Sequence, residues 1–139
     1  MHRSERLWWI FGGVFDKFPK LRVAFAHGGG SFPYTLGRIE QGFIQRPDLC
    51  AVENSNNPIS YLNKFYVDSI VHSEDSLNYL IKTMGVKQIA LGTDYPFPLG
   101  ENPPGKIIEN SESLSIDMKE RLYNGTALEW LDLDKKLFI

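Results

Sequence analysis

The stretch that decides the fold is Leu-Gly-Thr-Asp-Tyr-Pro-Phe-Pro-Leu at residues 91–99, which follows the apolar run Gln-Ile-Ala at 88–90. It predicts a buried strand that ends on Asp94, because Pro96 and Pro98 cannot continue a strand ladder. In parallel α/β proteins, the carboxyl ends of the strands carry the chemistry. We therefore expect the Asp94 carboxylate to lie at a functional edge of a sheet.

A second strand end of the same kind lies upstream, where Leu-Arg-Val-Ala-Phe-Ala-His at 21–27 runs into the glycines 28–30. Its central residues are apolar on both faces, which is typical of a parallel strand that is covered on both sides. The glycines would let a ligand approach the backbone closely. Imidazole can hold or release a proton near neutral pH, so His27 is a candidate acid/base or metal ligand. A buried structural histidine is the alternative.

Strands and helices alternate along the chain. We predict helices over 7–18 and 32–44, a helix start at Asn57 and Pro58, and a helix that Ser73 caps and Gly85 ends. We also predict strands near 21–27, 64–71 and 88–94, and a helical C-terminal part that is broken near Asn124 and Gly125. The alternation predicts a parallel sheet with right-handed crossovers. Because a closed (β/α)8 TIM barrel needs eight strand-helix units, we predict an α/β fold that is a partial barrel of about three units. A doubly wound sheet is the alternative.

The composition narrows the class of protein. The 139 residues are enough for one domain, and the net charge of −2 without a basic stripe argues against a nucleic-acid partner. No apolar run approaches the roughly 20 residues that span a bilayer, so we expect no membrane segment. Cys50 is the only cysteine, which excludes an intramolecular disulfide and fits a cytoplasmic protein.

Each candidate residue also has an ordinary structural role. Asp94 could cap a turn, and Arg38, on the helix after His27, could form a surface ion pair or bind a carboxylate through two hydrogen bonds. We expect His72, after the second strand, to be structural or exposed. The chain has no His-x-His and no cysteine cluster. His27 and Asp94 provide two metal ligands at most, whereas a zinc site usually needs three or four.

Several stretches together resemble the C-terminal part of decarboxylases in the amidohydrolase superfamily. They are Phe-Pro-Lys-Leu-Arg-Val at 18–23, His-Gly-Gly-Gly at 27–30, Arg-Pro-Asp-Leu-Cys at 46–50 and Gly-Thr-Asp-Tyr-Pro-Phe-Pro-Leu-Gly at 92–100. The resemblance implies a (β/α)8 barrel with one zinc-type ion at its C-terminal face. Residues 1–139 would then form about three C-terminal strand-helix units of a single barrel domain.

The resemblance also implies roles for individual residues. Asp94 matches a metal ligand, and His27 matches a catalytic histidine that works with the metal-bound water. Arg38 matches an arginine that reaches a substrate carboxylate, often across a dimer interface, and Phe97 matches an aromatic residue that lines the substrate pocket. The implied reaction is non-oxidative loss of carbon dioxide from a small carboxylate substrate, in tryptophan catabolism through kynurenine or in aromatic degradation. A related metal-dependent hydrolase is the alternative.

The chain also departs from the family pattern. The family's His-x-His and a further histidine ligand have no counterpart here. We therefore expect a C-terminal fragment that self-associates as a homo-oligomer or needs the missing N-terminal half. On this hypothesis the isolated chain binds zinc weakly and is catalytically inactive.

Overall fold

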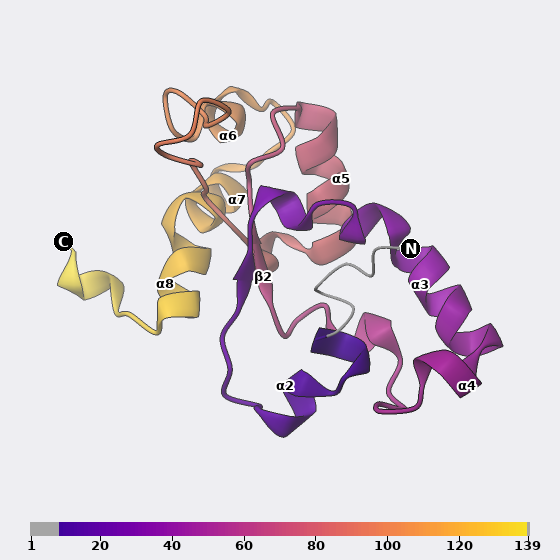
Figure 1. The fold of residues 1–139 in the computed structure, drawn as a ribbon. Helices are drawn as coiled ribbons and strands as arrows, with labels where there is room; N and C mark the ends of the chain where they lie inside the picture. The colour runs from indigo at the N-terminus through magenta and orange to yellow at the C-terminus, as the bar shows by residue number, and fades with distance from the viewer. Residues whose placement is uncertain (1–8, 139) are drawn as a thin grey trace. The chain divides into compact units, whose positions relative to one another are not determined.

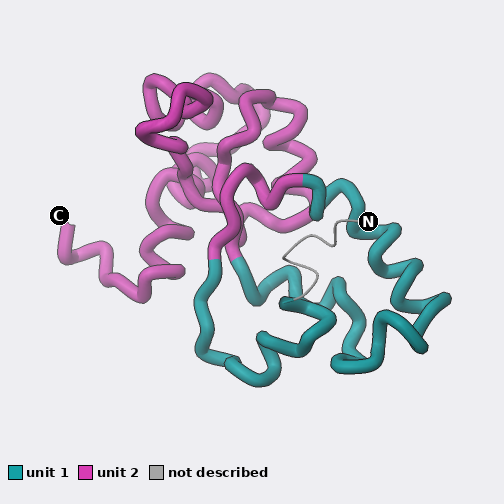
Figure 2. The backbone as a smooth tube through the Cα atoms, in the orientation of Figure 1, with its two compact units in different colours: residues 1–23, 31–65 teal, residues 24–30, 66–139 magenta. Residues whose placement is uncertain are grey.

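The computed structural model describes residues 9–138, which form two compact units (Figures 1 and 2). Unit 1 contains the residues up to 23 and residues 31–65, and unit 2 contains residues 24–30 and those from 66 onward. The chain therefore leaves unit 1 for residues 24–30 and returns to it before entering unit 2 for good.

The described residues of unit 2 form one three-stranded sheet. Its strands are β1 (Ala24–Phe25), β2 (Tyr66–Asp68) and β3 (Ile89–Ala90), in the order β1-β2-β3. Both pairings are parallel: Phe25 pairs with Val67, and Val67 pairs with Ile89. The predicted parallel sheet is therefore confirmed, and the carboxyl ends of its strands lie at one edge.

The strands are shorter than the sequence predicts because other groups replace the ladder hydrogen bonds at their ends. After β1, the Gly28 amide donates to the Asp68 carboxylate instead of to a neighbouring strand. After β3, the Leu91 amide donates to the Leu122 carbonyl, and the Gly92 amide donates to the Ser69 hydroxyl. The predicted ranges 21–27, 64–71 and 88–94 thus contain the strands but overestimate their lengths.

Helices follow the strands within unit 2. The longest is α5 (Glu74–Met84), which Ser73 caps through its hydroxyl and Gly85 ends, as the sequence predicts. Further along lie a 3₁₀ turn at Val86–Gln88, α6 (Lys106–Asn110), α7 (Ile116–Glu120), α8 (Thr126–Leu131) and a 3₁₀ turn at Lys135–Leu137. The core of this unit contains buried side chains from the strands and helices: Val67, Leu77, Leu80, Ile89, Ile108 and Leu122.

The prediction of a helix break near Asn124 and Gly125 is wrong. A π-helical segment, Arg121–Gly125, connects α7 to α8 without interrupting the helical backbone. Gly125 has ordinary right-handed helical angles (φ −59°, ψ −42°). A Cβ at this position would lie 3.0 Å from the Arg121 Cδ. The glycine therefore makes room for the arginine side chain instead of ending the helix.

Unit 1 is built from one long helix, α3, and several short ones around aromatic side chains. Residues 9–11 are helical, and α2 (Val14–Lys17), α3 (Phe32–Gln45), α4 (Pro47–Cys50) and a 3₁₀ turn at Pro58–Tyr61 follow. The Phe65 ring lies 6.0 Å from Phe15 and 5.6 Å from Phe32, measured between ring centroids. The predicted helix over 7–18 is interrupted at Gly13, whose φ is +64°; its first two residues lie outside the described residues.

None of the helices among the described residues has the length and hydropathy required to cross a membrane.

Candidate functional site

The two side chains that the sequence singled out lie next to each other in unit 2. His27 begins a 3₁₀ turn, His27–Gly29, one residue beyond the end of β1, and Asp94 follows β3. The His27 Nε2 lies 3.5 Å from the Asp94 Oδ1. The His27 side chain is 63% exposed and that of Asp94 is 21% exposed. The imidazole is therefore open to solvent on one side and faces a carboxylate on the other.

The backbone at these strand ends is left-handed. His27 has φ +58°, Asp94 has φ +55°, and His72, which follows β2, has φ +54°. Aspartate and histidine adopt this conformation more readily than most residues, but it remains uncommon outside glycine. Such conformations gather at functional sites, where the surrounding structure holds them. In this fold a residue with positive φ follows each of the three strands within four residues.

Asp68, at the end of β2, and Ser69, which follows it, also belong to this region, and the sequence analysis did not single them out. The Asp68 Oδ1 accepts hydrogen bonds from the Gly28 amide at 2.8 Å and from the Ile70 amide at 3.1 Å. The buried Ser69 hydroxyl accepts from the Gly92 amide at 3.2 Å. The available signal was a polar residue at the carboxyl end of a predicted strand, the same pattern that identified His27 and Asp94.

Phe97 lies on a compact loop that follows Asp94. The loop is closed by the Glu101 amide, which donates to the Thr93 carbonyl at 3.0 Å, and by the Phe97 amide, which donates to the Asp94 carbonyl at 2.8 Å. Gly100 is required there, because a Cβ would lie 2.6 Å from the Thr93 oxygen. Phe97 is 65% exposed. Its predicted role as a wall of the substrate pocket stays a prediction.

Arg38 belongs to unit 1. It lies on α3 with an exposed side chain. The planar guanidinium of an arginine can bind a carboxylate through two parallel hydrogen bonds. Its predicted role in substrate binding also stays a prediction.

A cavity of about 430 Å³ in unit 2 has His72 at its wall. The exposed His72 agrees with the expectation for this residue. Glu74, another wall residue, accepts a hydrogen bond from the Ser111 hydroxyl at 2.7 Å, which lowers the pKa of its carboxyl. The rest of the wall comes mostly from the loop before α6 and from α6 itself: Gly100, Glu101, Asn102, Lys106, Ile107, Asn110 and Ser111.

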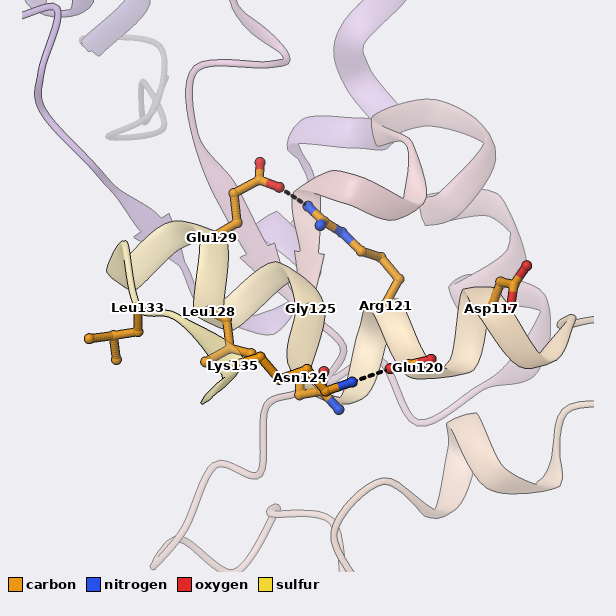
Figure 3. Close-up of a pocket in the computed structure, with 9 residues that line it drawn as sticks. All are labelled: Asp117, Glu120, Arg121, Asn124, Gly125, Leu128, Glu129, Leu133 and Lys135. Atoms are coloured by element: carbon orange, nitrogen blue, oxygen red, sulfur yellow. Dashed lines mark hydrogen bonds and ion pairs between the residues drawn. The ribbon is translucent and has the colours of Figure 1, made fainter. Parts of the chain in front are cut away.

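A larger cavity, of about 530 Å³, lies along the C-terminal helices (Figure 3). Four of its charged side chains form two ion pairs: Arg121 with Glu129 at 2.5 Å, and Lys135 with Glu120. The hydrogen bond from Lys135 lowers the pKa of Glu120. Neither cavity has His27 or Asp94 among its lining residues. Cavity size therefore does not identify the strand-end pair.

The strand-end pair fits part of a metal site. A carboxylate and an imidazole are ordinary ligands of zinc and similar ions. Within residues 9–138, however, no group of three or more His, Cys, Asp and Glu side chains is arranged to hold a metal ion. The described residues thus offer two donors of the right chemistry, as the sequence indicated.

The comparison with known families settles the membership of the chain. The family model described as amidohydrolase matches residues 1–133. The chain belongs to the amidohydrolase family. The predicted family is confirmed, and the three parallel strands with their helices agree with a partial barrel of that family.

Among curated relatives, the chain is 58% identical over 130 residues to 2-amino-3-carboxymuconate-6-semialdehyde decarboxylase of Dictyostelium discoideum. The match covers 94% of this chain and 36% of that relative. The chain thus spans little more than a third of the length of this relative.

Solved structures of decarboxylases share the fold. The 5-carboxyvanillate decarboxylase from Sphingomonas paucimobilis matches with a TM-score of 0.80 at 22% identity, over 93% of this chain and 39% of that one. A dihydroxybenzoic acid decarboxylase from Polaromonas, solved with bound manganese, matches with a TM-score of 0.75 at 23% identity, over 96% and 41% of the two chains. At these identities the likeness concerns the fold.

Proposed function

We propose that this chain carries the C-terminal part of the active site of a metal-dependent, non-oxidative decarboxylase. The proposed substrate is 2-amino-3-carboxymuconate-6-semialdehyde, a small carboxylate. The observation that carries the proposal is the His27–Asp94 pair, 3.5 Å apart at the carboxyl ends of parallel strands. The 58% identity to a decarboxylase of that name supports the choice of substrate.

The proposed chemistry breaks one carbon–carbon bond. The bonding electron pair stays on the substrate carbon, carbon dioxide leaves, and the carbon takes up one proton. His27 would move that proton, because an exposed imidazole beside a carboxylate can both accept and donate it. Asp94 would orient the imidazole and serve as a ligand of a divalent ion. Such an ion, zinc or manganese, would supply Lewis acidity and lower the pKa of a water molecule.

Arg38 and Phe97 would bind the substrate in this proposal. The Arg38 guanidinium would hold a substrate carboxylate, and Phe97 would contact the apolar part of the molecule. Both side chains are exposed within their own units, so a ligand has access to them. The remaining metal ligands would come from outside residues 9–138.

A chimera tests this proposal directly. The matched 130 residues of the Dictyostelium decarboxylase are replaced by the corresponding residues of this chain, and the loss of the semialdehyde absorbance is followed with zinc or manganese added. We expect turnover. His72→Ala is the matched control for a substitution at His27. Like His27, His72 is an exposed histidine with a positive φ, but it follows a different strand. A folded, metal-loaded chimera that leaves the semialdehyde unchanged would contradict the proposal.

A related hydrolase is the second candidate, because the family model itself is described as amidohydrolase. A chimera that hydrolyses lactones and spares the semialdehyde would favour it. The isolated chain gives a further test: with two donors among the described residues, we expect weak zinc binding and no turnover. A single tight zinc ion per chain, with turnover, would contradict this expectation.

A further inference from the structure

Asp68 lies at the centre of the strand-end region although it is not one of the paired side chains. It is the last residue of β2, the middle strand, and it is partly buried. One carboxylate oxygen, Oδ1, accepts two backbone amides, from Gly28 and Ile70. Hydrogen bonds to a carboxylate are roughly twice as strong as those between neutral groups. Asp68 therefore holds the first residue after His27 in a fixed position.

The approach of Gly28 to this region depends on its having no side chain. Gly28 has φ +57°, and a Cβ there would lie 2.6 Å from the Val71 Cγ1 and 3.2 Å from the Leu80 Cδ2. The turn that carries His27 is thus pressed against the residues that follow β2. The hydrogen bond from the Gly28 amide to Asp68 fixes the position of this turn along that contact.

Gly92, which follows β3, packs closely against Asp68 in the same way. A Cβ at Gly92 would lie 2.7 Å from the Asp68 Cβ and 3.1 Å from its Oδ2. The Gly92 amide is bonded to the hydroxyl of Ser69, the next residue after Asp68. Asp94 lies two residues after Gly92. The backbone that carries Asp94 is therefore positioned by Asp68, at the end of the middle strand, and by Ser69, the residue that follows it.

A direct metal-binding role for Asp68 is not supported. Asp68, His27 and Asp94 do not form a three-ligand group, since the part of the chain that the structure describes contains no such group. The Oδ1 is already occupied by two amides, and the Cβ and Oδ2 face the Gly92 backbone.

We propose that Asp68 is a positioning residue, which fixes the separation of the His27 imidazole and the Asp94 carboxylate by holding the turns after β1 and β3 at the end of β2. Its value for catalysis rests on the proposed function, whereas the positioning itself is a property of the fold. The side chain never touches the substrate. It acts through Gly28 on one side and through Gly92 on the other.

Nuclear magnetic resonance on the 139-residue chain tests the positioning without any assay of activity. Asp68→Asn keeps an Oδ1 acceptor, and Asp68→Leu removes it in a side chain of similar size. We expect the Gly28 amide to exchange at least tenfold faster in Asp68→Leu, with partial restoration in Asp68→Asn. At fixed pH, Asp94→Asn should shift the His27 ring resonances in the native chain and in Asp68→Asn, and much less in Asp68→Leu.

Ser69→Ala provides a second variant in case Asp68→Leu does not fold. It removes the acceptor of the Gly92 amide and leaves Asp68 in place, so the Gly28 amide should be unchanged while the response of the His27 ring to Asp94→Asn falls. Ring responses to Asp94→Asn that are as large in the folded Asp68→Leu and Ser69→Ala variants as in the native chain would overturn the proposal. In the chimera, Asp68→Leu should lower kcat at least tenfold with little change in KM. An inactive chimera with the expected resonance changes would contradict the proposed function and leave the positioning role supported.

Discussion

The strand-end region and the C-terminal cavity are both polar parts of unit 2, but they use their charges differently. Around the C-terminal cavity, Arg121 faces Glu129 and Lys135 faces Glu120, so these four charged groups neutralise one another in pairs (Figure 3). At the strand ends, backbone amides occupy Asp68, while the His27 ring remains 63% exposed beside Asp94. Most charged groups at the C-terminal cavity are thus paired with one another, whereas the strand-end region keeps an exposed imidazole beside a carboxylate.

The largest effect should come from breaking the exposed pair. His27→Ala in the chimera should lower kcat by about 10²–10⁴-fold, the usual contribution of a general acid or base. Lys135→Ala, which breaks an ion pair at the edge of the C-terminal cavity, should leave kcat within about twofold. Steady-state kinetics on both variants measure the contrast. Equal losses would mean that the two regions do not differ as described.

The close packing of Gly28 beside the His27–Asp94 pair can be tested by measuring the free energy of unfolding. Gly28→Ala should destabilise the chain by about 2–4 kcal/mol, because it combines a left-handed backbone with a contact of 2.6 Å. Gly37→Ala is the matched control within α3, where a Cβ meets nothing within 4 Å. That change should stabilise the chain by about 0.5–1 kcal/mol. Urea unfolding measures both, and a destabilising Gly37→Ala would contradict this account.

A smaller effect is expected where charges are already paired. Glu129→Gln should lower the free energy of unfolding by at most about 1 kcal/mol, because Glu129 is half exposed and water screens its ion pair with Arg121. The difference should shrink in high salt. The Arg121 Nε is buried and has no hydrogen-bond partner among the described residues, so the guanidinium is held through its Nη2, which donates to the Lys87 carbonyl and to Glu129. A loss above 3 kcal/mol by thermal unfolding would show a stronger pair.

The smallest expected effect is a pH dependence at Glu74. The hydrogen bond from Ser111 lowers the pKa of this carboxyl, so the folded chain favours its ionised form. The resulting stabilisation is fully present above the ordinary carboxyl pKa of about 4.3 and is lost as the pH falls through the lower folded value. Glu74→Gln and Ser111→Ala should both reduce the drop in Tm between pH 6 and pH 3. An unchanged drop in both variants would exclude this contribution.

The sequence predicted those features that depend on local chemistry. Ser73 and Gly85 delimit α5 because a hydroxyl cap and a glycine stop act within a few residues. Asn57 likewise caps the turn at Pro58–Tyr61 through its side chain. The parallel strands followed from the alternation of apolar runs with helices, and the proximity of His27 and Asp94 followed from their positions at strand ends.

Features that depend on distant partners were not predictable in this way. The ends of the strands are set by amides that bond to Asp68, Ser69 and Leu122, and no local pattern indicates those bonds. The π-helical segment reflects the fit between Gly125 and the Arg121 side chain, whereas glycine alone suggested a break. Asp68 has the pattern of a polar residue at a strand end, but the sequence does not show its hydrogen bonds to the Gly28 and Ile70 amides.

The left-handed backbone at His27 and Asp94 also predicts how these positions would respond to random mutagenesis. In a saturation library selected only for correct folding, asparagine, glycine, aspartate and histidine should be enriched at both positions, and valine, isoleucine and threonine should be depleted. A selection for activity would then remove most of the survivors. At each position, the residue types that pass the selection for folding but fail the selection for activity are those that suit the backbone and not the catalytic role.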